Sequence, residues 1–113
     1  MIFAAATDEN TLFVFASIAE PIAYCESIDV EDGGWIFWDD AGSALSAEFL
    51  TPNHRGRFAV GGGTYRLVQV SGKPTLAESI ASIHHINGNP YFSTLSAVQE
   101  HLATATQVAQ HGA

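Results

Sequence analysis

The chain is organised around residues 29–40, which read DVEDGGWIFWDD. Acidic residues stand at both ends of this segment, and the apolar run from Trp35 to Trp38 lies between them. The glycines Gly33 and Gly34 separate the first acids from the apolar run, which is typical of a loop that enters a strand. The segment therefore predicts an acidic loop, then a strand, then a turn.

The predicted strand carries large apolar side chains on both faces. Because strand side chains alternate, Trp35 and Phe37 point to one face, and Ile36 and Trp38 to the other. This pattern indicates either a central strand or a strand that exposes an aromatic residue for binding.

Further strands are expected where β-branched and aromatic residues cluster. They are predicted over residues 2–6, 12–16, 45–50, 58–60 and 64–70. The first two form a hairpin through the turn at residues 8–10, and the strand at 45–50 forms a second hairpin with the Trp35–Trp38 strand.

Three helices are predicted from apolar residues at helical spacing. The first spans residues 18–27, after a Ser17–Glu20 capping spacing. The second begins at Thr75, which stands three residues before Glu78, and its buried stripe is formed by Leu76, Ile80 and Ile83. The third begins near residue 93 or 94, with Leu95, Val98 and Leu102 on its buried side, and the tail over 106–113 is expected to fray.

This order of elements predicts an α+β fold in one domain over residues 1–113. The expected architecture is a mostly antiparallel sheet of about five to six strands, with three helices packed mainly on one face. A chain of 113 residues is long enough to bury one core, and its 47% apolar content is that of an ordinary globular protein.

The net charge is the unusual feature of the composition. Twelve acids oppose four basic residues, for a net charge of −8, and the first 54 residues contain ten acids and no Lys or Arg. Such a surface repels nucleic acid and anionic membranes, and attracts basic proteins or cations. The alternative is that the charge only keeps a small domain soluble.

The single cysteine, Cys25, excludes an intramolecular disulfide and fits a reducing compartment. The apolar run over residues 2–6 is too short for a signal peptide or a membrane span. We therefore expect a cytoplasmic protein.

The acids and tryptophans around residues 29–40 form the candidate partner-binding site. Acidic side chains speed and orient encounter with a basic partner, and aromatic side chains supply buried area. The residues assigned to this surface are Glu26, Asp29, Glu31, Asp32, Trp35, Trp38, Asp39 and Asp40. The alternative for its acidic half is a solvated loop without a partner. A calcium loop fits poorly, because the Trp35–Trp38 run favours a strand.

The other chemistry-bearing residues favour structural roles. Cys25 falls on the apolar stripe of the first helix, and the adjacent His84 and His85 diverge on the second helix. Residues 61–63 are glycines followed by a strand, which predicts a hairpin turn and not a phosphate loop. His101 is expected at the surface. Arg55, like the other arginines, is expected to pair with some of the many acids.

Residues 23–35, AYCESIDVEDGGW, and residues 37–42, FWDDAG, stand in a short acidic chain that begins with a hairpin. In this combination the chain resembles the small bacterial immunity proteins encoded beside polymorphic toxins of contact-dependent or type VI systems. The resemblance implies a stoichiometric inhibitor that plugs a toxin domain, often a basic nuclease or a nucleotide-using transferase. It implies no catalytic residues.

Three functions follow as hypotheses. The first is a non-enzymatic immunity protein that binds a basic toxin through the acidic surface, without a cofactor or metal. The second is a small cytosolic hydrolase or transferase that uses Cys25 or a histidine, and the third is a structural or assembly subunit. The oligomeric state stays open.

Overall fold

The computed structural model describes the backbone of residues 1–56 and 60–111 and the side chains of residues 1–56 and 62–105. The strands in this part are β1 (Ile2–Ala6), β2 (Thr11–Phe15), β3 (Trp35–Trp38), β4 (Ala44–Thr51), β5 (His54–Arg55), β6 (Val60–Gly61), β7 (Thr64–Gln69) and β8 (His85–Ile86). The helices are α1 (Ala19–Tyr24), α2 (Ser27–Glu31), α3 (Leu76–Ser79), which continues as a 3-10 turn over Ile80–Ser82, and α4 (Leu95–His111).

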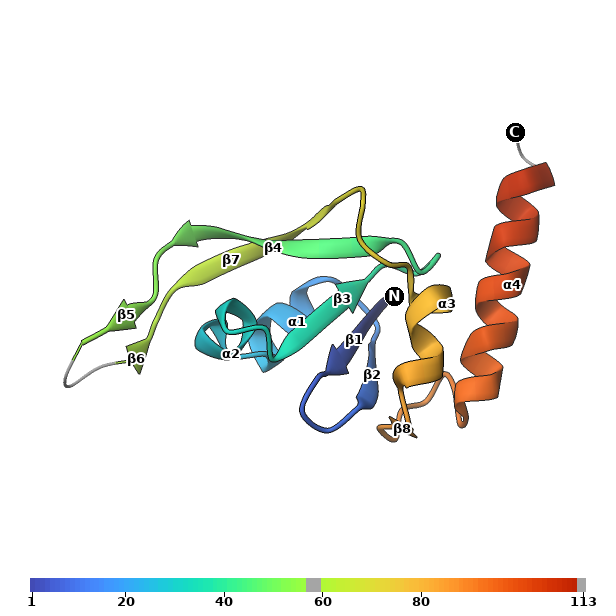
Figure 1. The fold of residues 1–113 in the computed structure, drawn as a ribbon, viewed down its shortest axis with the longest axis horizontal. Helices are drawn as coiled ribbons and strands as arrows, with labels where there is room; N and C mark the ends of the chain where they lie inside the picture. Colours follow the sequence, from blue (N-terminus) through green and yellow to red (C-terminus); the bar gives the residue numbers. More distant parts are fainter. Residues whose placement is uncertain (57–59, 112–113) are drawn as a thin grey trace.

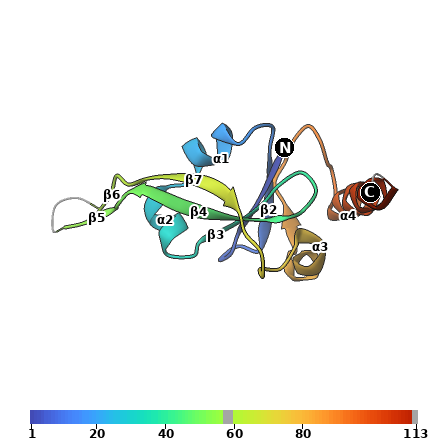
Figure 2. The same cartoon turned by 90° about the horizontal axis from the view of Figure 1, so that it is seen from above.

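Six strands form one sheet in the order β7-β4-β3-β1-β2-β8 (Figure 1). All neighbours in it pair antiparallel except β2 and β8, which pair in parallel. The short strands β5 and β6 form a separate hairpin, which extends from the sheet at the end of the molecule opposite α4 (Figures 1 and 2). The predicted α+β fold with a mostly antiparallel sheet is confirmed.

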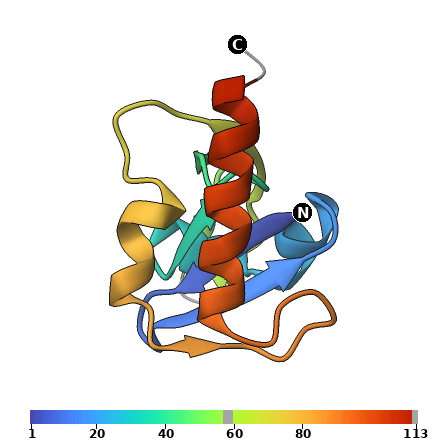
Figure 3. The same cartoon turned by 90° about the vertical axis from the view of Figure 1, so that its right-hand side faces the viewer.

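Helices cover both faces of the sheet, whereas packing mainly on one face was expected. On β1, Ile2 and Ala4 pack in the cluster that contains Cys25 and Val30, from the α1–α2 region. Phe3 packs on the other face, in the cluster that contains Leu76, Val98 and the remaining buried residues of α3 and α4. Figure 3 shows α3 and α4 side by side. Because every residue of β1 is apolar, its sequence lacks the alternation that marks a solvated face.

The predicted first helix is two short helices. The backbone is extended at Cys25, with φ −86° and ψ 114°, and this break in the helix separates α1 from α2. The hydroxyl of Tyr65 donates to the Cys25 carbonyl at 2.9 Å, which satisfies a backbone group that the break releases. Asp29 and Glu31 consequently lie on α2 and not in the predicted loop.

The second predicted helix has the expected start and a shorter course. The side chains of Thr75 and Glu78 form the capping box, and Leu76, Ile80 and Ile83 are buried. The helix ends in the 3-10 turn, so His84 and His85 do not lie on it as predicted. The backbone N–H groups of both histidines donate instead to the backbone carbonyl of Asn10, and His85 is the first residue of β8.

The third predicted helix is α4, which buries Val98 and Leu102 as expected. Its backbone is helical to His111, over much of the predicted tail, whose side chains lie outside the described residues. The predicted strand at 58–60 falls largely on residues 57–59, which also lie outside them. Within the described chain, no helix is long and apolar enough to span a membrane.

Candidate functional site

The strand β3 divides the predicted acidic surface into two groups. Asp29, Glu31 and Asp32 lie before the strand, on α2 and at its end, and Glu26 precedes that helix. Asp39 and Asp40 lie after the strand, in the turn to β4. Four residues of strand separate the groups by roughly 10 Å or more. The two groups of acids therefore lie at opposite ends of β3.

Asp39 and Asp40 stabilise the β3–β4 turn. Asp39 Oδ1 accepts hydrogen bonds from the N–H groups of Ala41 and Ser43, at 3.0 and 2.9 Å. Nε2 of His101 lies 2.9 Å from the Asp40 carbonyl and 3.1 Å from its Oδ1. His101, expected at the surface, is thus partly buried and ties α4 to this turn. Both acids have structural partners, but the side chain of Asp40 is 60% exposed, so its assignment to the partner surface stays a prediction.

Glu31 and Asp32 share one arginine. Arg55, on β5, donates to Glu31 Oε1 from both Nε and a terminal nitrogen, and to Asp32 Oδ1 at 2.8 Å. These hydrogen bonds raise the pKa of Arg55. Two carboxylates against one guanidinium leave the group negative, so it can still attract a cation. The expectation that arginines pair with acids is confirmed here and for Arg66.

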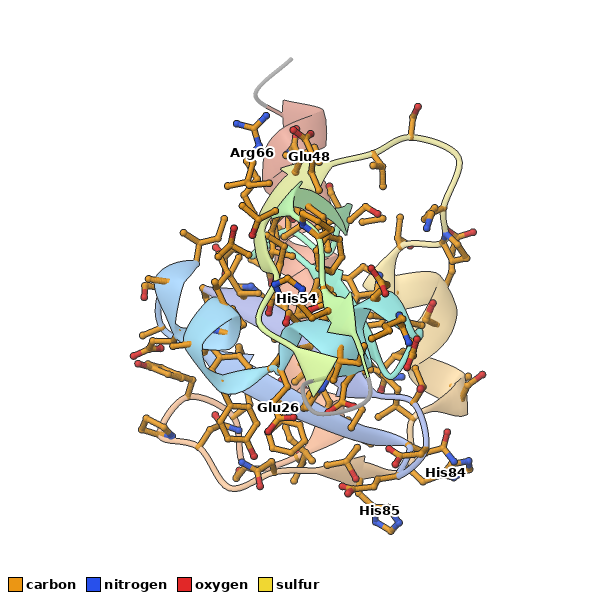
Figure 4. The ribbon with its side chains drawn as sticks, turned by 90° about the vertical axis from the view of Figure 1, so that its left-hand side faces the viewer. Glu26, Glu48, His54, Arg66, His84 and His85 are labelled. Atoms are coloured by element: carbon orange, nitrogen blue, oxygen red, sulfur yellow. The ribbon has the colours of Figure 1, made fainter. Side chains whose placement is uncertain are left out.

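The Arg66 pair lies elsewhere on the surface. Arg66 donates to Glu48 at 2.6 Å, and Figure 4 shows this pair away from Glu26. His84 and His85 project at another edge of the molecule (Figure 4). These residues therefore do not extend the acidic site.

A pocket of about 360 Å³ opens beside Asp29 and Asp32. The turn between β1 and β2 adds Asp8 and Glu9 to its lining, so four carboxylates border it. The complete lining is formed by Ala6, Asp8, Glu9, Phe13, Tyr24, Asp29, Asp32, Gly34 and Trp35. No lysine, arginine or histidine is among these residues. We call this feature the acidic pocket.

Three aromatic rings form one wall of the acidic pocket. Trp35 meets Phe13 edge-on, with ring centroids 5.2 Å apart at 69°, and meets Tyr24 at 6.0 Å and 81°. Tyr24 is 57% exposed, so its ring is accessible from solvent. Aromatic faces and carboxylates both attract cations, so this lining fits an ammonium or guanidinium group.

Strand pairing explains why the sequence did not reveal this pocket. Ala6 pairs with Trp35, and the Thr7 N–H donates to the Gly34 carbonyl at 3.0 Å. Asp8 and Glu9 were interpreted only as a turn, and no local signal links them to residues 29–35. The acidic pocket could be predicted only with knowledge of the long-range pairing between β1 and β3.

The two predicted aromatic anchors have different positions. Trp35 is half-buried and lines the pocket, so its assignment to the partner surface stays a prediction. Trp38 is only 1% exposed, and its indole N–H donates to the Pro74 carbonyl at 3.0 Å. Trp38 is therefore a core residue, and its assignment to the partner surface is wrong. Glu26 is exposed next to α2 but does not line the pocket.

Cys25 is unsuited to nucleophilic catalysis. Its side chain is 2% exposed, and it lines neither the acidic pocket nor the larger cleft described below. Burial, with a smaller contribution from the charge of Asp29, raises the pKa of its thiol to about 12. Because the thiolate is the reactive form, this environment suppresses reactivity.

We expect iodoacetamide to leave Cys25 unmodified in the native protein at pH 8 and to modify it fully in 8 M urea. Mass spectrometry of the intact chain over time gives the two rates. If the native protein were labelled as fast as free cysteine, the thiolate of Cys25 would be accessible. This result would favour the hypothesis of a hydrolase or transferase that uses Cys25.

Among the described residues, no group of three or more histidines, cysteines or carboxylates is arranged to hold a metal ion. The four acids that line the acidic pocket are among the residues searched and do not form such a group. Comparisons with protein-family models, curated proteins and solved structures found no match.

Proposed function

We propose that this protein is a non-enzymatic acidic binding protein of the immunity type, present in a bacterial cytoplasm. It neutralises a cognate basic toxin domain by occluding the active site of that domain. The observation that carries this proposal is the acidic pocket, in which four carboxylates border an aromatic wall and only one of them, Asp32, is paired with an arginine, Arg55, which lies outside the lining.

The acidic pocket supplies both parts of a recognition surface. The net charge of −8 accelerates encounter with a basic domain, and this effect weakens as salt rises. Tyr24 and Trp35 then provide the aromatic contact area that dominates binding energy in many interfaces. A lysine or arginine of the partner is the group expected in the pocket, because it satisfies both features.

A toxin of this class binds substrates that carry negative charge, such as nucleic acid or nucleotides, in a positively charged cleft. The carboxylates of the acidic pocket imitate that charge. A protein bound there excludes the substrate by volume and by electrostatic competition. The proposed mechanism therefore requires no chemistry from the bound protein.

The test is an affinity capture with two variants that remove the same charge. Asp8→Asn with Asp29→Asn neutralises two acids of the pocket, and Glu48→Gln with Glu100→Gln neutralises two exposed acids outside it. We expect wild type and the second variant to retain a basic protein from the lysate of the source cells at 50 mM salt. The pocket variant should bind it at least about tenfold more weakly.

The captured complex should also dissociate faster and associate more slowly at 500 mM salt, as measured by surface plasmon resonance. Equal weakening by both double variants would mean that only net charge matters and would contradict the site. A captured partner that is acidic would contradict the proposed function itself.

A further inference from the structure

A second cleft lies where β3 and β4 separate. The two strands pair only at Phe37 with Leu45 and at Trp38 with Ala44. Continuing this register would place Trp35 opposite Ala47, but that pairing does not form. A cleft of about 520 Å³ lies there instead, and we call it the strand cleft.

The backbone of β4 has a free edge in the strand cleft. The Val70 N–H donates to the Ala44 carbonyl at 3.2 Å, so the backbone groups of Ala44 face β7. Because this direction alternates along an antiparallel strand, Ser46 and Glu48 also bond toward β7, and Ala47 and Phe49 face the cleft. No strand in the described part of the chain pairs with Ala47 or Phe49 on that side.

The opposite wall of the strand cleft, formed by β3, also has unpaired backbone groups. The Gly34 carbonyl accepts from Thr7 on β1, so the next residue, Trp35, directs its backbone groups away from β1 and into the cleft. Ile36, which also lines the cleft, is 47% exposed. An unpaired edge beside exposed apolar side chains is a template for an added strand.

The charge near the cleft selects among possible occupants. Trp35 lines both the strand cleft and the acidic pocket, so the two adjoin. The charged residues of the cleft's own lining are one acid, Glu31, and one base, Lys73, so the excess of negative charge comes from the adjoining acidic pocket. A second copy of this chain carries a net charge of −8 and is repelled there. A basic segment is attracted, and its apolar side chains fit against Ile36 and Phe49.

We propose that the free edge of β4 accepts an extended basic segment of a partner protein as an added strand, paired with Ala47 and Phe49. Main-chain hydrogen bonds supply the affinity in this mode, and alternate side chains of the added strand supply specificity. The inference does not depend on the partner being a toxin, because it rests on the strand register and on the adjacent charge.

The free protein gives the first readout. We expect the amides of Ala47 and Phe49 to exchange with deuterium at least about tenfold faster than those of Ser46 and Glu48, which bond toward β7. Exchange is followed by NMR on the 15N-labelled full chain. Equal protection of all four amides, independent of protein concentration, would show that the edge is already covered and would overturn the proposal.

The probe is an end-capped peptide of sequence Thr-Lys-Val-Arg-Val-Lys-Thr. Saturation with it should slow exchange at Ala47 and Phe49 at least about tenfold. A peptide with glutamate at the three basic positions should bind at least about tenfold more weakly, and N-methylation of alternate backbone amides should abolish protection. Peptide-induced changes in chemical shift that are limited to residues of the acidic pocket, without slower amide exchange at Ala47, would overturn the added strand. They would leave the proposed function in place.

Two variants at one position separate backbone pairing from side-chain contact. Ala47→Pro removes the N–H that faces the cleft and should abolish peptide protection at Phe49, whereas Ala47→Val keeps the N–H and should retain it. Retained β4–β7 amide signals show that each variant is folded. Protection that appears without peptide and rises with protein concentration would identify a second copy as the occupant and overturn the assignment to a basic partner.

Discussion

The Trp38→Ala variant is expected to lose about 4 kcal/mol of unfolding free energy, the largest effect of any single substitution considered for this chain. Trp38 is 1% exposed and packs in the cluster that contains Phe3, Leu76 and Val98. The substitution leaves a large cavity at the junction of β3 with α3 and α4. It also leaves the Pro74 carbonyl without its indole donor.

Urea unfolding followed by circular dichroism measures this loss. Ile36→Ala, two positions away and on the same face, is the matched control, because Ile36 is 47% exposed and should lose less than about 1 kcal/mol. A Trp38→Ala variant as stable as Ile36→Ala would contradict the core position of Trp38. That result would support the assignment of Trp38 to the partner surface, which was made from the sequence.

The Gly42→Ala variant is expected to lose about 3 kcal/mol. Gly42 has a φ of +84°, and a Cβ there would lie 2.9 Å from Leu102 Cδ2. Leu102 is 4% exposed, so its side chain has little room to move away. The Gly42 carbonyl accepts the N–H of Leu76 at 2.9 Å, which ties the β3–β4 turn to the start of α3.

The Gly72→Ala variant separates the contribution of backbone strain from that of the contact between the new Cβ and Leu102. Gly72 has a nearly equal φ of +83°, but a Cβ there would meet nothing within 4 Å. Its loss should therefore be about 1 kcal/mol, from backbone strain alone. Equal losses for the two variants in urea unfolding would show that the contact with Leu102 is relieved without cost.

Local patterns were sufficient to predict most elements of the fold. The capping box of Thr75 and Glu78 identified the start of α3, and the aromatic run identified β3 with its correct faces. β8 was missed because two residues in parallel pairing with β2 have no sequence signature. The break at Cys25 was also missed, because the apolar spacing continues across it and the extended backbone is stabilised by the distant Tyr65.

The candidate site was only partly predictable for the same reason. Asp29, Asp32 and Trp35 were assigned from their local composition, and all three line the acidic pocket. Asp8 and Glu9 reach it through the pairing of β1 with β3, which lies beyond the reach of a local pattern. The contact of Asp40 with His101 could not be predicted, because His101 is 61 residues away in the chain.

The most direct test of the central claim is growth protection. The protein encoded beside this one is expressed from an inducible promoter, alone or together with wild type, the Asp8→Asn and Asp29→Asn variant, or the Glu48→Gln and Glu100→Gln variant. We predict that the neighbouring protein arrests growth, that wild type and the second variant restore it, and that the pocket variant does not at equal expression. Growth restored equally by the pocket variant would contradict the acidic pocket as the inhibitory surface, and a neighbouring protein that arrests growth despite wild type would contradict the immunity function.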